Sequence, residues 1–306
     1  MNQAIRRTPQ TMKEFKTGFI SIMGRPNVGK STLLNALMGE KIAITSSKPQ
    51  TTRANIQGIL TGEDFQLVFI DTPGYHKAKD NINKMMVQQA KDSLEAVDAI
   101  YLLVQPDEFI GAELQSLLKV LDKVDAVKFL IINKVDNYKR EAVYEMANKM
   151  FPQMEFKHVL PVSALKGTNV DKLLELTLEE MEAGEAIFPA EEITTQPENL
   201  LVAEFIREQV FRQLSDEIPY QIVVETEKIE DRSDDLMYIA ASIIVNRDSQ
   251  KGMVIGKGGK MLKEISTASR VSLSNFFGVK IYLELYVKVK TGWQTKDEYL
   301  KMQGLY

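Results

Sequence analysis

Eight residues near the start of the chain have the types and spacing of a phosphate-binding loop. Residues 24–31 follow the pattern G-x-x-x-x-G-K-[ST], in which backbone N–H groups surround an anion, the lysine reaches the outer phosphates and the hydroxyl residue holds Mg²⁺. The apolar residues 19–23 predict a buried strand before this loop, and residues 32–38 predict a helix after it. The sequence therefore predicts a nucleoside triphosphate site that contains Gly24, Arg25, Pro26, Asn27, Val28, Gly29, Lys30, Ser31 and Thr32.

A second segment of this site consists of Asp71, Thr72, Pro73 and Gly74, which follow the apolar residues 65–70. An Asp at the carboxyl end of a buried strand faces the ligand crevice of an open α/β sheet. Alone, this tetrapeptide would be typical of a tight turn. After a phosphate loop it predicts that Asp71 binds Mg²⁺ through water and that the Gly74 N–H faces the terminal phosphate.

A third segment, Asn133-Lys134-Val135-Asp136, indicates which base is bound. The Asp136 carboxylate accepts hydrogen bonds, and guanine offers N1–H and an amino group on one edge, whereas adenine has no such pair. An unpaired carboxylate in a closed pocket would cost a few kcal/mol, which is enough for discrimination of about 10²-fold or more. We expect Asn133 to brace the loop, the Lys134 stem to cover the ring, and Ser163 and Ala164 to place a backbone N–H at the guanine oxygen.

The polar residues 40–53 predict a mobile loop that contains Gln50, Thr51, Thr52 and Arg53. Either threonine could complete Mg²⁺ coordination beside Ser31 and Asp71, and we favour Thr52. A loop that is held by the terminal phosphate and released on its loss is an order–disorder switch.

Two further residues bear on hydrolysis. Tyr75 follows Gly74 at a position where many signalling GTPases have a Gln that orients the attacking water, and because Tyr has no amide we expect slow intrinsic hydrolysis. Asn27 could contact a monovalent cation, K⁺, that compensates charge in the transition state.

Composition narrows the class of protein. The 306 residues are long enough for two domains, and the absence of cysteine excludes disulfides and thiolate metal sites. No apolar stretch approaches the roughly 20 residues that span a bilayer, and residues 1–16 lack the apolar core of a signal peptide. A cytosolic location is therefore expected. The net charge of −4 means that any polyanion-binding surface must be local.

Alternating apolar segments predict the fold of residues 1–185. Residues 1–17 are expected to be a loose leader. Beyond it, predicted strands at 19–23, 56–60, 65–70, 99–104, 129–132 and 159–162 alternate with predicted helices at 32–38, 76–96, 112–121, 138–150 and 170–181. This order predicts an α/β domain with a mostly parallel sheet and helices on both faces. Residues 186–199, with two prolines, are expected to be a linker.

Residues 200–306 have a different pattern, which predicts a smaller α+β domain. A predicted helix (200–214) and two strands (221–229 and 237–246) precede a Gly-rich turn, which a helix (260–277) and a strand (280–290) follow. Between residues 246 and 290, nine basic residues stand against three acidic ones. A basic turn that opens a helix suits a phosphate backbone, and Gly-x-x-Gly is the clamp of KH domains, which holds about four nucleotides. We expect RNA to be bound by Gly256, Lys257, Gly258, Gly259, Lys260 and Lys263.

Taken together, these motifs resemble the Era family of bacterial-type, ribosome-associated GTPases over nearly the whole chain. GRPNVGKS, QTTR, DTPG, NKVD and SA occur in order, followed by a linker and a GKGG-bearing KH domain. The resemblance implies GTP hydrolysis with Mg²⁺, binding near the 3′ end of small-subunit ribosomal RNA during subunit maturation, and peripheral association with the inner face of the membrane. We further expect a monomer. Two features depart from the family pattern: a longer leader, and Tyr75 where the family usually has an aliphatic residue.

Two other functions are compatible with parts of this sequence. A P-loop kinase is disfavoured because Asp136 selects guanine and no acceptor site is evident, and tight ATP binding would favour it. A non-enzymatic adaptor that binds GTP to hold a protein partner would be favoured if RNA binding survived a negative charge at Gly258.

Overall fold

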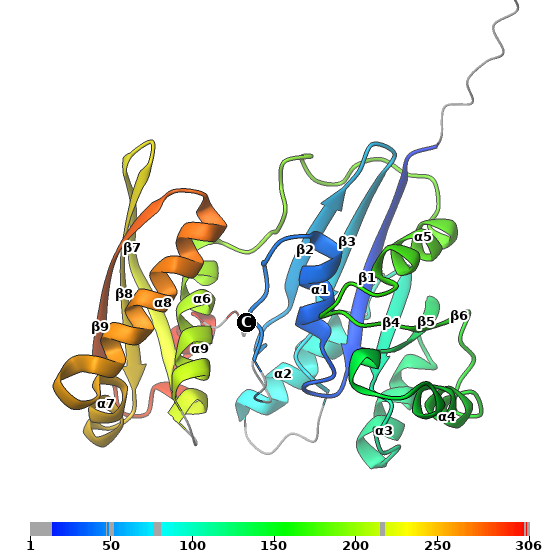
Figure 1. Ribbon diagram of the computed structural model, residues 1–306, viewed down its shortest axis with the longest axis horizontal. Helices are drawn as coiled ribbons and strands as arrows, with labels where there is room; N and C mark the ends of the chain where they lie inside the picture. The colour runs from blue at the N-terminus through cyan, green and yellow to red at the C-terminus, as the bar shows by residue number, and fades with distance from the viewer. Residues whose placement is uncertain are drawn as a thin grey trace, which may run out of the picture.

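The computed structural model describes residues 14–46, 48, 52–75, 81–214, 218–302 and 304. They form two domains that lie side by side, with α6 of the second domain next to the first (Figure 1). Gln50 and Thr51, two of the predicted switch residues, lie outside the described residues.

The described residues of the first domain form a six-stranded sheet in the order β2-β3-β1-β4-β5-β6. Strand β2 pairs antiparallel with β3, and the other neighbours are parallel. All six residues of β4 are buried, as expected for a parallel strand covered on both faces. The strands are β1 (Lys16–Gly24), β2 (Ile56–Thr61), β3 (Phe65–Asp71), β4 (Ala99–Val104), β5 (Val127–Ile132) and β6 (His158–Pro161).

Helices cover both faces of this sheet, and each face has its own apolar core. On one face, Leu33 and Leu173 pack against Ile20 and Tyr101. On the other face, Leu117 and Met146 pack with the alternate strand residues. The helices are α1 (Lys30–Met38) and α5 (Val170–Glu180) on the first face, and α2 (Asn81–Asp92), α3 (Ala112–Leu121) and α4 (Arg140–Met150) on the second. This arrangement confirms the predicted α/β class.

The second domain has a three-stranded sheet in the order β7-β8-β9, in which β7 is antiparallel and β9 parallel to β8. Helices α6 and α8 pack on one face through Phe205, Ile206, Ile265 and Leu273, while Trp293 is fully buried in a small cluster with Ile244. The elements are α6 (Glu198–Gln213), β7 (Val223–Ser233), β8 (Leu236–Val245), α7 (Asp248–Ile255), α8 (Lys260–Phe277), β9 (Lys280–Val289) and α9 (Asp297–Lys301).

Several predicted elements differ from the structure. Helix α2 ends at Asp92, earlier than the predicted end at residue 96. Strand β1 begins at Lys16, so the last two residues of the expected leader are extended: the Lys16 N–H donates to the carbonyl of Asp64 and Thr17 pairs with Gln66 of β3. Helix α6 begins at Glu198, within the expected linker. Helix α7 was not predicted, because only Gln250 and Val254 of its residues are buried and its apolar pattern is therefore weak.

The segment between the two domains is held against the first one. The Thr194 hydroxyl donates to the carbonyl of Gln57 at 2.6 Å, and the Ile59 N–H donates to the carbonyl of Ile193 at 2.9 Å. The connection therefore runs along β2 with fixed contacts, which limits how freely the domains can move apart.

Within the described residues, no helix combines the length and the apolar character that crossing a membrane requires.

Candidate nucleotide and nucleic-acid sites

The phosphate loop lies where β1 ends and α1 begins. Gly29 precedes α1 with φ 101°, a left-handed conformation that favours glycine. A Cβ at this position would come within 2.3 Å of the Asn133 amide nitrogen, so the third segment of the predicted site touches the loop directly. The start of α1 adds about half a positive charge at the same place.

Lys30 is buried inside the loop. Its Nζ donates to the carbonyls of Gly24, at 3.2 Å, and Arg25, at 3.0 Å. Burial lowers the pKa of Lys30 to about 8, and the nearby carboxylates of Asp71 and Glu108 oppose this shift. Lys30 therefore remains mostly protonated at pH 7 and can neutralise a phosphate.

The three predicted Mg²⁺ ligands converge. The Ser31 hydroxyl donates to Asp71 Oδ2 at 2.5 Å and lies 2.9 Å from the Thr52 hydroxyl. Burial raises the pKa of Asp71 to about 6, while Lys30 and the two hydroxyls lower it. Asp71 Oδ1 is buried with no hydrogen-bond partner in the described residues.

This donor set fits Mg²⁺, which prefers hard oxygen ligands and keeps several of its waters. Elsewhere in the described part of the chain, no group of three or more His, Asp or Glu side chains could hold a metal. Ser31, Thr52 and Asp71 present together the oxygen donors that would hold the ion.

The remainder of the second segment lies against the phosphate loop. The Thr72 hydroxyl donates to the carbonyl of Ile22 at 2.8 Å, and a Cβ on Gly74 would come within 2.7 Å of Pro26. Tyr75 is buried, with its hydroxyl 3.1 Å from the Ser116 hydroxyl of α3. Tyr75 therefore packs into the core, with its hydroxyl directed at α3.

One predicted phosphate-loop side chain points away from the cavity. The Arg25 guanidinium lies 3.0 Å from Glu113 and 3.7 Å from Glu108, and Arg25 is not among the residues that line the cavity described below. Other predicted nucleotide-site residues are likewise absent from the lining of this cavity: Gly24, Val28, Asp71, Thr72, Pro73, Asn133, Asp136, Ser163 and Ala164.

The residues predicted for the base form one connected network. Asn133 Nδ2 donates to the carbonyl of Val28 at 2.8 Å, and its Oδ1 accepts the Ala164 N–H at 3.0 Å. Lys134 donates to the carbonyl of Asn27 at 2.5 Å. The Ser163 hydroxyl donates to Asp136 Oδ1 at 2.6 Å and orients this exposed carboxylate.

A cavity of about 680 Å³ adjoins these segments. Several of its lining residues were not predicted, because they come from the loop after α1 and from α6, and no motif marks them. They are Ile44, Thr45, Ser46, Lys48, Phe211 and Arg212; the predicted residues that line it are Pro26, Asn27, Gly29, Lys30, Ser31, Thr32, Thr52, Gly74 and Lys134.

The Gly-rich turn of the second domain lies between α7 and α8. Gly256, Gly258 and Gly259 have φ values of 71°, 60° and 79°, which brings the chain round sharply to start α8 at Lys260. A Cβ on Gly258 would meet nothing within 4 Å, so the backbone there is open to a ligand. Lys257, Lys260 and Lys263 are exposed around it.

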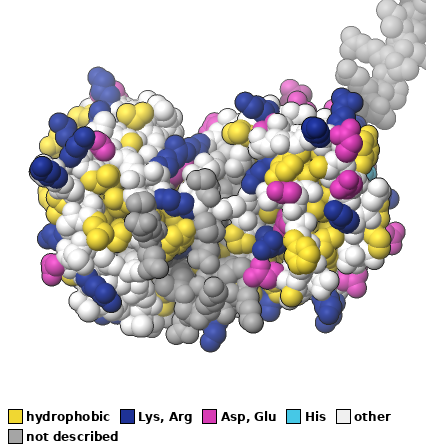
Figure 2. Space-filling model, turned by 60° about the horizontal axis from the view of Figure 1, so that its bottom comes forward, with side chains coloured by type: hydrophobic (Ala, Val, Ile, Leu, Met, Phe, Trp, Pro, Cys, Tyr) yellow, Lys and Arg dark blue, Asp and Glu magenta, His cyan; other side chains and the backbone are white. Residues whose placement is uncertain are grey.

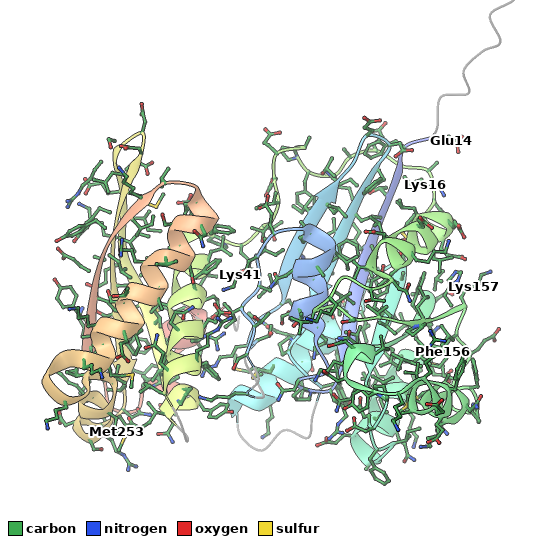
Figure 3. All side chains as sticks on the ribbon, in the orientation of Figure 1. Glu14, Lys16, Lys41, Phe156, Lys157 and Met253 are labelled. Atoms are coloured by element: carbon green, nitrogen blue, oxygen red, sulfur yellow. The ribbon has the colours of Figure 1, made fainter. Side chains whose placement is uncertain are left out.

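The surroundings of this turn suit a polyanion. Figure 2 shows several Lys and Arg side chains projecting from the second domain, the left lobe of that view. Met253, on α7 at the lower left of Figure 3, is 56% exposed beside the turn. Nucleic acid is the ligand that combines phosphates for the lysines with bases for an apolar neighbour.

Comparison with known proteins identifies both domains. Residues 19–134 match the model of a family described as 50S ribosome-binding GTPases, and residues 217–294 match the KH domain. The chain is 46% identical to GTPase Era of Geobacter metallireducens over 291 residues, which is 95% of this chain and 98% of that one. It is 43% identical to GTPase Era of Clostridium botulinum over 290 residues, with the same coverage.

Solved structures show the same arrangement of both domains. A crystal structure of Era in complex with MgGDPNP and nucleotides 1506–1542 of 16S ribosomal RNA has a TM-score of 0.88 at 35% identity, covering 95% of this chain and 99% of that one. A tyrosine-to-alanine variant of Aquifex aeolicus Era, bound to GDP and aluminium fluoride, has a TM-score of 0.89 at the same identity and coverage. The chain therefore belongs to the Era family of GTPases.

Proposed function

We propose that this protein is a GTP-driven switch that binds small-subunit ribosomal RNA near its 3′ end and acts in maturation of the small ribosomal subunit. One observation carries the link between the two sites. Thr52 lies 2.9 Å from Ser31 in the Mg²⁺ set, and the next residue, Arg53, donates to carbonyls of Ile222 and Tyr220 in the second domain at 2.9 and 3.1 Å. A change in the position of Thr52 would therefore displace Arg53 and its contacts with the RNA-binding domain.

The relatives support the choice of ligands. Era in a solved structure carries MgGDPNP and a segment of 16S ribosomal RNA, and the residues of this chain suit the same ligands. In this proposal, the GTPase domain ends near residue 185, and the KH domain begins with α6 at Glu198, with the linker between them.

Each segment of the nucleotide site has a task in hydrolysis. Mg²⁺, when bound, neutralises phosphate charge. Lys30 and the N–H groups of the loop hold the outer phosphates, and the Gly74 N–H faces the terminal one. Since Tyr75 is packed against α3, no side chain at that position activates water, and turnover without a partner is expected to be slow.

Potassium should accelerate this hydrolysis. Asn27 lines the cavity, and its backbone has φ 65°, a left-handed conformation that turns the phosphate loop at this residue. In this proposal, the monovalent cation binds at this turn, beside the phosphates. We expect several-fold faster GTP turnover in potassium than in sodium at equal ionic strength. Identical rates in the two salts would exclude this role, and an Asn27→Ala variant that keeps the full potassium effect would exclude Asn27.

Nucleotide state should change RNA affinity. We expect the complexes with GDP and with a non-hydrolysable GTP analogue to differ at least several-fold in affinity for an RNA fragment from the 3′ end of small-subunit ribosomal RNA, because Thr52 and Arg53 join the two sites. Fluorescence anisotropy at one fixed salt concentration measures this difference. Equal affinities would refute the switch while leaving GTP binding and RNA binding intact.

The remaining parts of the proposal concern location and assembly. We propose a cytoplasmic monomer with a peripheral fraction at the inner face of the cell membrane. The family resemblance supports this location, and flotation with vesicles of bacterial lipid would test the membrane fraction.

A further inference from the structure

The nucleotide cavity is not built by the GTPase domain alone. Phe211 and Arg212, from the last turn of α6 in the second domain, line it together with Gly29, Lys30 and Thr52. Figure 1 shows α6 on the side of the second domain that faces the loop following α1.

A buried carboxylate fixes Arg212 in this place. Glu208, one helical turn earlier, is fully buried, and its Oε1 accepts from Arg212 Nη2 at 3.0 Å. The same Oε1 accepts the Thr45 N–H at 3.1 Å, and Lys41 forms an ion pair with Oε2. Lys41 reaches from the first domain toward α6 in Figure 3. One carboxylate therefore holds both Arg212 and the loop that forms another wall of the cavity.

Other contacts hold α6 and the segment that follows it against this loop, on both sides of Thr52. Lys48 donates to the carbonyl of Phe211 at 2.6 Å and also contacts that of Leu214, so it caps the carboxyl end of α6. Arg53 is buried and donates to backbone carbonyls of residues 219, 220 and 222. The end of α6 is thus a fixed wall of the cavity.

The charge of the cavity lining favours a polyphosphate at Arg212. The lining contains Lys30, Lys48, Lys134 and Arg212 but no Asp or Glu. Lys48 and Lys134 both donate to backbone carbonyls, at Phe211 and Asn27. The Arg212 side chain is 52% exposed although Glu208 pairs with it, so part of its guanidinium fork remains accessible. A planar guanidinium with several donors suits phosphate oxygens.

We propose that Arg212 of the RNA-binding domain binds the polyphosphate of the guanine nucleotide, so that the second domain completes the nucleotide site. The inference rests on GTP binding by the first domain. It makes α6 a part of the nucleotide site in the same way that an arginine supplied from a second domain or protein stabilises phosphate charge in other GTPases.

The experiment compares Arg212→Gln and Arg212→Lys with the wild type in the full-length protein. Arg232→Gln serves as the matched control, because it removes the same charge from an exposed position of the second domain beside Tyr238, outside the cavity. Calorimetry with Mg²⁺ and either GDP or a non-hydrolysable GTP analogue measures affinity, and single-turnover assays measure hydrolysis. Thermal unfolding confirms that each variant is folded.

We expect Arg212→Gln to lower nucleotide affinity or the hydrolysis rate about tenfold or more. Arg212→Lys keeps the charge and should show a smaller loss, and Arg232→Gln should match the wild type. Equal losses for GDP and the analogue would support a contact with the inner phosphates. A loss limited to the analogue or to hydrolysis would support a contact with the terminal phosphate.

A second surface offers a different role for Arg212, which is RNA binding. The same variants distinguish this role from nucleotide binding. Arg212 also lines a groove between α6 and α8 that contains Lys260 and Lys263, the lysines of the predicted RNA clamp. If Arg212→Gln weakens RNA binding but leaves nucleotide affinity and hydrolysis unchanged, the proposal is overturned. A wild-type protein that fails to bind guanine nucleotides would instead refute the family function on which the inference rests.

Discussion

Replacing Asp136 by Asn will move the base preference of this protein from guanine to xanthine. The Ser163 hydroxyl holds the Asp136 carboxylate at 2.6 Å, and in the proposed site this carboxylate would accept from N1–H and the amino group of guanine. Asn offers one acceptor and one donor, and xanthine has a carbonyl where guanine has its amino group. We expect affinity for GDP to fall about 10²-fold or more and affinity for xanthosine diphosphate to rise by a similar factor.

Competition calorimetry with GDP, xanthosine diphosphate and ADP measures this exchange. The neighbouring residue provides a control: Asn137 is exposed, and Asn137→Ala should leave the preference for guanine intact. An Asp136→Asn variant that still binds GDP as tightly as the wild type would show that another group selects the base.

Placing Asp at Gly258 will abolish RNA binding while GTP binding persists. The new carboxylate would stand among Lys257, Lys260 and Lys263, where a phosphate backbone is expected, and would repel it. The fold should tolerate this change, because Gly258 has φ 60°, a conformation that Asp and Asn adopt more readily than other residues, and a Cβ there meets nothing within 4 Å. We expect RNA affinity to fall at least tenfold.

Gly258→Asn separates charge from shape. It adds a side chain of nearly the same size without charge, so it should retain more RNA affinity than Gly258→Asp at the same salt concentration. If both variants bind RNA like the wild type, the turn is not the clamp and the adaptor function gains support. Unchanged GDP affinity in both variants would confirm that the first domain is intact.

Elements with a strong apolar pattern could be predicted closely from the sequence. Strand β4 and helix α3 have the predicted bounds, because β4 is apolar throughout and α3 places Leu114, Leu117, Leu118 and Leu121 on one face. Helix α7 was missed for the opposite reason. Its start depends on the Gln250 side chain, which accepts the N–H groups of Asn246 and Arg247, and a contact of this kind leaves little trace in apolar periodicity.

The candidate site was predictable where a motif lies within one segment. The pattern around Lys30 and the carboxylates Asp71 and Asp136 could be recognised by spacing, and the structure brings Ser31, Thr52 and Asp71 together. The direction of a side chain was not predictable: Arg25 pairs with Glu113, and Tyr75 turns to Ser116. Arg212 carries no local signal, because its place beside the cavity depends on how two domains pack through Glu208.

Calorimetry on the unmodified protein with guanosine and adenosine diphosphates in the presence of Mg²⁺ tests the central claim, that Asp136 makes this a guanine-nucleotide site, most directly. The account predicts that GDP binds about 10²-fold or more tightly than ADP. Equal affinity for the two nucleotides would contradict it.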